Sequence, residues 1–184
     1  GIDYGTGSGR VFLVQTENGK IISQFIKTYT HGTIDEYLHD QKLPHGFSLQ
    51  NGNDYLEVLE EGIPYVIDDA KINPDDIVGL GIDFTSSTVI FVDENMDPIH
   101  TKSGFKDNPH AYVKLWKHHG AEEEAKLLYD TAINQKQRWL GNYGYNVSSE
   151  WMIPKIMEVM NKAPEVINET YAIMDAGDWI VNKL

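Results

Sequence analysis

The first thirty residues alternate short apolar runs with glycine and turn residues. Three segments rich in Ile, Val and Phe, at residues 1–4, 10–16 and 20–30, are typical of β-strands. Asn18-Gly19, between the second and third segments, favours a tight two-residue hairpin turn. The pattern therefore predicts an antiparallel meander of three strands.

The hydrophobic period then changes from that of a strand to that of a helix. Residues 31–51 are polar and contain glycine and histidine, so we expect a loop. From Asp54 to Ile67 apolar residues recur at helical spacing, with Asn53 or Asp54 as the N-cap. Pro64 lies inside this helix and predicts a kink.

The remainder of the chain predicts two strands followed mainly by helices. In chain order these are a continuous apolar strand at 77–83, a strand at 88–92, helical structure from 109 to about 136, a helix after Ser148-Ser149-Glu150, a short strand at 172–174 and a last helix at 178–184. Together the elements describe an α/β fold of the ribonuclease-H and actin type, in which helices flank a mixed sheet. Both ends of the sequence fall inside predicted elements, which indicates a fragment.

Composition narrows the class of protein. The chain has 184 residues, 41% of them hydrophobic, and a formal net charge of −13. No apolar run reaches the roughly 18 residues that span a membrane, and the acidic balance argues against nucleic-acid binding. The lack of cysteine suits a reducing cytoplasm. We therefore expect a cytoplasmic protein with neither a nucleic-acid nor a membrane partner.

The opening stretch "GIDYGTGSGR" places a carboxylate inside an apolar strand, directly before a turn of small residues. A buried carboxylate is costly unless a partner neutralises it. The glycines let backbone N–H groups approach a phosphate, and the Thr6 and Ser8 hydroxyls can donate to its oxygens. Asp3 is placed to hold Mg²⁺, directly or through water, and Arg10 adds a positive charge. An ordinary glycine-rich hairpin, with Asp3 binding backbone groups, explains the same residues.

The pattern D-x-G-T-x-S-x-R resembles the phosphate-binding hairpin of the FGGY carbohydrate kinases. The stretches "GIDFTSSTVIFVDENMDP", "KDNPHAYVKLWKHH", "SSEWMIPKI" and "DAGDWIVNKL" resemble, in the same order, those family members that phosphorylate L-ribulose. The resemblance implies two actin-like domains with the active site between them. Residues 1–184 would be most of the N-terminal domain, and the rest of that domain and the C-terminal domain would lie outside this chain.

The resemblance also implies roles for individual residues. It assigns Asp3 to Mg²⁺, the hairpin residues Thr6, Gly7, Ser8 and Arg10 to the ATP phosphates, and Asp83, Thr85, Ser86 and Trp116 to the sugar. This sequence has Ser86-Ser87 where the family leads us to expect a small residue followed by cysteine. The helix that follows Glu150 would lie beside the sugar pocket.

The implied reaction is transfer of the γ-phosphoryl group of ATP to the terminal hydroxyl of L-ribulose, giving L-ribulose 5-phosphate in arabinose catabolism. The catalytic aspartate base would lie beyond residue 184, so we expect the isolated chain to be inactive. A homodimer of the full-length protein is compatible with the resemblance. Three alternatives stay open: a kinase of another pentulose or polyol, a non-catalytic actin-like nucleotide-binding module, and a metal-dependent nuclease in which Asp3 and Asp83 pair.

Three histidines follow the second strand region. On a predicted helix, His110, His118 and His119 do not converge on one point, and no zinc-binding pattern completes them. We therefore expect surface or hydrogen-bonding residues, or residues that line the cleft together with Lys114 and Lys117.

Overall fold

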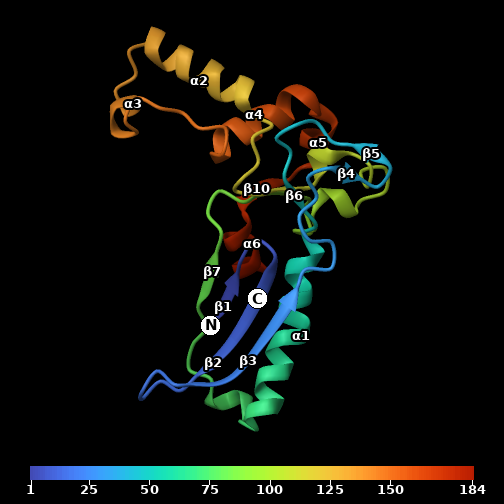
Figure 1. Ribbon diagram of the computed structural model, residues 1–184, viewed down its shortest axis with the longest axis vertical. Helices are drawn as coiled ribbons and strands as arrows, with labels where there is room; N and C mark the ends of the chain where they lie inside the picture. The colour runs from blue at the N-terminus through green and yellow to red at the C-terminus, as the bar shows by residue number, and fades with distance from the viewer.

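The computed structural model describes residues 1–184 and contains two four-stranded sheets with helices around them (Figure 1). The strands are β1 (Ile2–Tyr4), β2 (Ser8–Val14), β3 (Ile21–Thr28), β4 (Tyr37–Leu38), β5 (Gln41–Lys42), β6 (Leu49–Gln50), β7 (Ile82–Phe84), β8 (Val89–Val92), β9 (Val113–Lys114) and β10 (Ala172–Asp175). The helices are α1 (Asn53–Ala70), α2 (Glu122–Asn134), α3 (Trp139–Asn142), α4 (Met152–Lys162), α5 (Pro164–Glu169) and α6 (Ala176–Lys183). None of these helices has both the length and the hydrophobicity that a membrane crossing requires.

The first sheet has the strand order β3-β2-β1-β7. The first three strands are antiparallel, and β7 is parallel to β1 with Asp83 in register with Asp3. This confirms the expected meander and the mixed character of the sheet. The connection between β2 and β3 is longer than the two-residue turn expected at Asn18-Gly19: its innermost hydrogen bond runs from the Gly19 N–H to Gln15 O at 2.9 Å and encloses residues 16–18.

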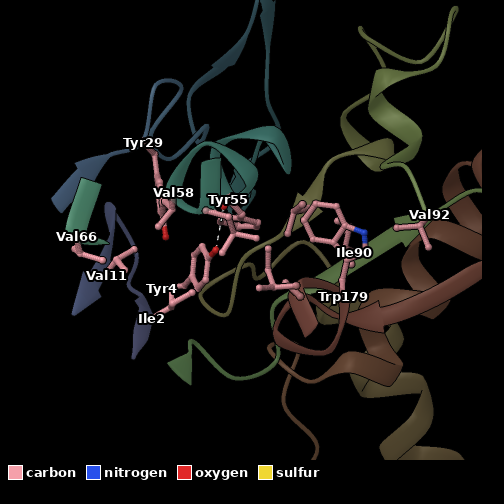
Figure 2. Packing of buried hydrophobic residues seen from close by; sticks show 14 residues of the cluster. Ile2, Tyr4, Val11, Tyr29, Tyr55, Val58, Val66, Ile90, Val92 and Trp179 are labelled. Carbon is pink, nitrogen blue, oxygen red and sulfur yellow. Dashed lines mark hydrogen bonds between the residues drawn. The ribbon is translucent and has the colours of Figure 1, made fainter. Parts of the chain in front are cut away.

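Helix α1 covers one face of this sheet at close range. A Cβ atom on Gly9 would lie 2.5 Å from a Val58 methyl carbon, and one on Gly62 would lie 2.5 Å from a Val11 methyl carbon. These two glycines therefore allow the backbones of β2 and α1 to approach. Figure 2 shows the core that results, with Tyr4 pointing toward α1, where its hydroxyl donates to the Tyr55 carbonyl at 3.0 Å.

The start of α1 differs from the expected cap. Gly52 is the N-cap, and neither Asn53 nor Asp54 caps the helix with its side chain. Asp54 is instead buried and accepts from the backbone N–H of His31 at 3.0 Å, while its other oxygen lies 2.6 Å from His31 Nδ1. Pro64 lies within α1 without ending it.

The second sheet has the strand order β10-β8-β9-β6 and lies between the first sheet and the helices α4 and α5. Its central strand β8 is buried on both faces. Val89 and Phe91 pack against α4 and α5, whereas Ile90 and Val92 belong to the same cluster as Trp179 and the first sheet. The strand expected at 88–92 and the helix expected at 178–184 are confirmed, and each helps to fix one sheet against the other.

Two sequence predictions are wrong. The apolar run 77–83 does not form a long buried strand: β7 pairs with β1 only over Ile82–Phe84, and Val78 is 83% exposed. The region after Pro109 forms one short 3₁₀ turn at Pro109–Ala111 and is then not helical until Glu122. Its backbone pairs with β6 and β8 at Lys114, which excludes a helix there.

Candidate functional site

The turn between β1 and β2 is held at its sides and open at its tip. The Gly5 N–H donates to Ser8 O at 3.0 Å, the Tyr29 hydroxyl donates to Gly5 O at 2.9 Å, and the Tyr29 N–H donates to Gly7 O at 3.2 Å. No atom lies within 4 Å of where a Gly7 Cβ would be. The turn is therefore a fixed loop whose tip leaves space for a ligand.

Two residues far along the chain attach to this turn at Thr6. The Gln50 side chain donates to Thr6 O at 2.7 Å, and the Trp116 indole N–H donates to Thr6 Oγ1 at 3.0 Å. Trp116 is 40% exposed, so it is not a core residue. The structure thus brings together the turn and Trp116, which the resemblance had assigned to two different ligands. Gln50 was missed, because an isolated glutamine in a polar segment carries no sequence signal.

Asp3 has a partner within this chain. Its Oδ2 lies 2.5 Å from Arg10 Nη1, directly across the β1–β2 ladder, with 33% of the Asp3 side chain and 41% of the Arg10 side chain exposed. The premise that Asp3 is a buried carboxylate awaiting a cation is therefore only partly right. Arg10 neutralises it, and both side chains remain open to solvent.

Asp83 extends this polar row by one strand. Because it is in parallel register with Asp3, the two carboxylates lie on the same face of neighbouring strands. Asp83 is exposed and has no cationic side chain within ion-pair distance. No group of three or more His, Cys, Asp or Glu residues could hold a metal ion. Two carboxylates nonetheless fit Mg²⁺, which uses one or two protein carboxylates together with water and substrate phosphates.

The chain beyond β7 presents hydroxyl groups at the end of the strand. The Thr85 N–H donates to Tyr4 O at 3.3 Å, and the Thr85 and Thr88 hydroxyls lie 2.8 Å apart. Ser86 is exposed, whereas Ser87 adopts a left-handed backbone with φ 57°. Of the candidate sugar contacts in this segment, Asp83 and Ser86 therefore face solvent and Thr85 is engaged internally. Glu150 lies apart from them, 3.3 Å from His119 Nε2.

Buried ionisable residues on both sides of Trp116 in the sequence fix the segment that carries it to α4. Glu158 Oε2 lies 3.1 Å from Lys114 Nζ and 2.9 Å from His118 Nε2, and all three side chains are fully buried. His118 Nδ1 accepts from the Ser48 N–H, so Nε2 carries the proton that is donated to Glu158. His118 is a hydrogen-bonding residue, which is one of the expected alternatives. Neither His118 nor Lys114 lies at the surface or lines the cleft, since both are buried.

Burial and charge act in opposite directions on this cluster. Burial disfavours an ionised Glu158, but the hydrogen bond from His118 and the charge of Lys114 outweigh burial and lower its pKa to about 2. Burial lowers the pKa of His118 to about 4, although the hydrogen bond to Glu158 opposes this shift. Burial also lowers the pKa of Lys114, and the charge and hydrogen bond of Glu158 oppose this shift. The geometry is that of a Lys114–Glu158 ion pair beside a neutral histidine.

Another buried histidine leads to a prediction about acid stability. His100 Nε2 accepts from the Gly52 N–H at 3.0 Å, and burial, followed by the charge of His31, lowers the pKa of His100 to about 4. Between pH 6.5 and 4 the unfolded chain binds a proton that the folded chain does not, so stability present above pH 6.5 is lost as the pH falls. We expect His100→Gln to reduce this loss by roughly 2–3 kcal/mol. Urea unfolding at pH 7 and pH 4.5 measures it.

The matched control is His45→Gln at an exposed position. It should leave the difference in unfolding free energy between the two pH values unchanged. If His100→Gln shows the same pH dependence as the unsubstituted protein, the proposed contribution of His100 is wrong.

Comparison with known proteins gives a specific result. No family model matches the sequence. Over all 184 residues, however, the chain is 66% identical to a ribulokinase from Staphylococcus aureus strain Newman, of which it covers 34%. Along its whole length the chain is therefore similar to curated ribulokinases. It spans about a third of the length of the curated ribulokinases that it matches.

Solved structures of sugar kinases share the fold of this chain. A xylulose kinase from Rhodospirillum rubrum matches 98% of the chain with a TM-score of 0.73 at 15% identity, over 32% of its own length. A gluconate kinase from Lactobacillus acidophilus matches the whole chain with a TM-score of 0.71 at 17% identity, also over 32% of its own length. These likenesses confirm the expected α/β fold of the ribonuclease-H and actin type.

Proposed function

We propose that this chain is part of an ATP-dependent kinase that phosphorylates the terminal hydroxyl of L-ribulose and yields L-ribulose 5-phosphate for L-arabinose catabolism in the cytoplasm. The observation that carries the proposal is the 66% identity to a ribulokinase along the whole chain. Residues 1–184 would form most of the N-terminal domain of two. The catalytic base and most of the adenine site would lie elsewhere in the full-length protein, so the chain alone should be inactive.

The nucleotide side of the site would be the turn between β1 and β2. Backbone N–H groups near Gly7 and the hydroxyls of Thr6 and Ser8 would donate to phosphate oxygens, and Arg10 would supply positive charge. Asp3 would hold Mg²⁺, directly or through water, with Asp83 beside it in register. When bound, the cation would neutralise charge on the phosphoryl oxygens. Because Asp3 and Arg10 are both partly exposed, their ion pair can open when a ligand binds. Asp3 would then bind Mg²⁺ and Arg10 would bind a phosphate.

The sugar side of the site would be formed by Trp116 and the end of β7. The indole ring of Trp116 is exposed and can stack on the C–H face of a pentulose. Its N–H is bonded to Thr6, which fixes the orientation of the ring. Asp83 and Ser86 are the exposed polar groups in the segment assigned to sugar hydroxyls, with Thr85 between them. The bond from Trp116 to Thr6 would couple sugar binding to the phosphate turn.

Substitution of Trp116 tests the sugar contact. In the full-length kinase, Trp116→Ala should raise KM for L-ribulose about five- to tenfold, because one stacking contact contributes about 1 kcal/mol. KM for ATP should change less. Trp116→Phe keeps a ring and should retain most of the affinity. Steady-state kinetics measure both, and an alanine variant with an unchanged KM for L-ribulose would place the sugar elsewhere.

A substrate panel tests the proposed function itself. The full-length protein should phosphorylate L-ribulose with ATP and Mg²⁺ at a higher kcat/KM than other pentuloses or glycerol. A higher value for another pentulose or polyol would reassign the substrate within the family. No transfer to any sugar would favour the non-catalytic nucleotide-binding module. A nuclease is disfavoured by the net charge of −13 and by the lack of a third acidic group near Asp3 and Asp83. Sedimentation would test the homodimer.

A further inference from the structure

Lys155 is a buried lysine that joins the two segments carrying the proposed sugar contacts. It lies on α4 and is fully buried. Its Nζ donates to Ser87 O at 2.7 Å, to Leu115 O at 2.8 Å and to Trp116 O at 3.4 Å. An ammonium group has three donors, so these three carbonyls use its full capacity. One side chain thereby fixes the segment after β7 against the segment after β9.

The same face of α4 holds the Trp116 segment a second time. Glu158 lies three residues after Lys155, so the two side chains leave neighbouring positions of the helix. Glu158 binds the Lys114 and His118 side chains, which precede and follow Trp116 by two residues. Lys155 binds the backbone between them. Trp116 is therefore an exposed ring on a segment whose backbone and flanking side chains are anchored to buried groups.

The conformation of Ser87 shows that the other segment also needs an anchor. Ser87 has φ 57°, a left-handed conformation that residues other than glycine adopt only where surrounding contacts fix it. Its carbonyl is the acceptor of the shortest Lys155 hydrogen bond. Ser86, the exposed candidate sugar contact, directly precedes it. Loss of the Lys155 ammonium would free this residue to relax.

We propose that Lys155 is a positioning residue for the sugar: it sets the distance between Ser86 and the Trp116 ring by binding the backbone of both segments. The proposal rests on the proposed sugar-kinase function. Lys155 does not itself reach the ligand, because its side chain is buried and its donors are occupied. Its effect should therefore fall mainly on sugar affinity, with a smaller effect on nucleotide affinity through the hydrogen bond from Trp116 to Thr6.

The test compares Lys155→Met with a matched control in the full-length kinase. Methionine retains the unbranched apolar stem and removes the donors. Its KM for L-ribulose should rise about tenfold, because small displacements of binding groups are costly, while KM for ATP stays within twofold. The control is Lys126→Met on α2, whose side chain is 78% exposed, and it should behave as the unsubstituted enzyme. A purely structural role would lower the melting temperature and the active fraction without raising KM.

A second variant and a second measurement keep the proposal testable in every case. Lys155→Gln retains two N–H donors on a shorter side chain and should give an intermediate KM. This variant replaces the methionine variant if the latter does not fold. Acrylamide quenching of Trp116, taken as the difference from the Trp116→Phe variant, should increase when Lys155 is replaced. This measurement needs no sugar, so it tests Lys155 even if the protein proves not to use L-ribulose. Unchanged KM in an active enzyme, or unchanged quenching in an inactive one, overturns the proposal.

Discussion

If the full-length protein has the proposed kinase activity, replacing Asp3 by asparagine should lower its kcat by on the order of 10²–10³-fold, the usual effect of losing one group that stabilises charge in the transition state. Asparagine keeps the size of the side chain but removes the charge that would hold Mg²⁺ beside the phosphates. The fold should survive, because Asp3 and its partner Arg10 are both partly exposed. Initial rates with ATP and L-ribulose, with Mg²⁺ concentration varied, measure the effect.

Two further variants make this result specific. Asp83→Asn, one strand away in register, should cause a smaller loss, since Asp83 is assigned to the sugar and reaches the metal at most as a neighbour. Asp130→Asn on α2 removes a carboxylate far from the turn and should leave the rate unchanged. Full activity of Asp3→Asn at all Mg²⁺ concentrations would remove Asp3 from the metal site.

The second large effect is expected on the free energy of unfolding, when the buried cluster of Lys114, His118 and Glu158 loses a charge. Glu158→Gln leaves the Lys114 ammonium fully buried without its counter-charge, 3.1 Å from where the carboxylate stood. Removing one partner of a buried ion pair costs about 3–5 kcal/mol. We therefore expect the free energy of unfolding, measured in urea, to fall by that amount.

A double substitution separates charge from packing in this cluster. Lys114→Met combined with Glu158→Leu removes both charges and should recover much of the loss, because an apolar pair of similar volume often replaces a buried ion pair at little cost. Glu123→Gln on α2, where the side chain is 87% exposed, is the control and should change stability little. If Glu158→Gln is no more destabilising than this control, the ion pair is not important for stability.

The parts of the fold that sequence predicts well are those whose pattern is local. The meander of β1, β2 and β3 shows clear apolar runs with glycines at the turns, and α1 shows helical spacing over a long stretch. The length of β7 was overestimated, because an apolar run alone does not reveal which of its residues pair with a neighbouring strand. Only Ile82–Phe84 pair with β1.

In the candidate site, too, the parts with a local sequence pattern could be predicted, and the parts that depend on distant residues could not. The turn carrying Thr6 and Ser8 could be predicted from the sequence because its small residues and Asp3 are contiguous, and its role in phosphate binding stays a prediction. Lys155 and Glu158 were missed, because charged residues on a helix normally indicate a solvated face. Their partners, Ser87 and Lys114, lie 68 and 44 positions earlier, and only the folded chain brings them together. The error over His118 has the same origin, since a helix was assumed where the backbone forms β9 and a turn.

A crystal structure of the full-length protein with Mn²⁺, a non-hydrolysable ATP analogue and L-ribulose is the most direct test. Anomalous scattering should locate the metal beside Asp3, with the terminal phosphate at the Gly5–Gly9 turn and the sugar against the Trp116 ring. Metal and phosphates bound away from this turn, with Asp3 still paired to Arg10, would contradict the assignment of this chain to the phosphate-binding half of a sugar kinase.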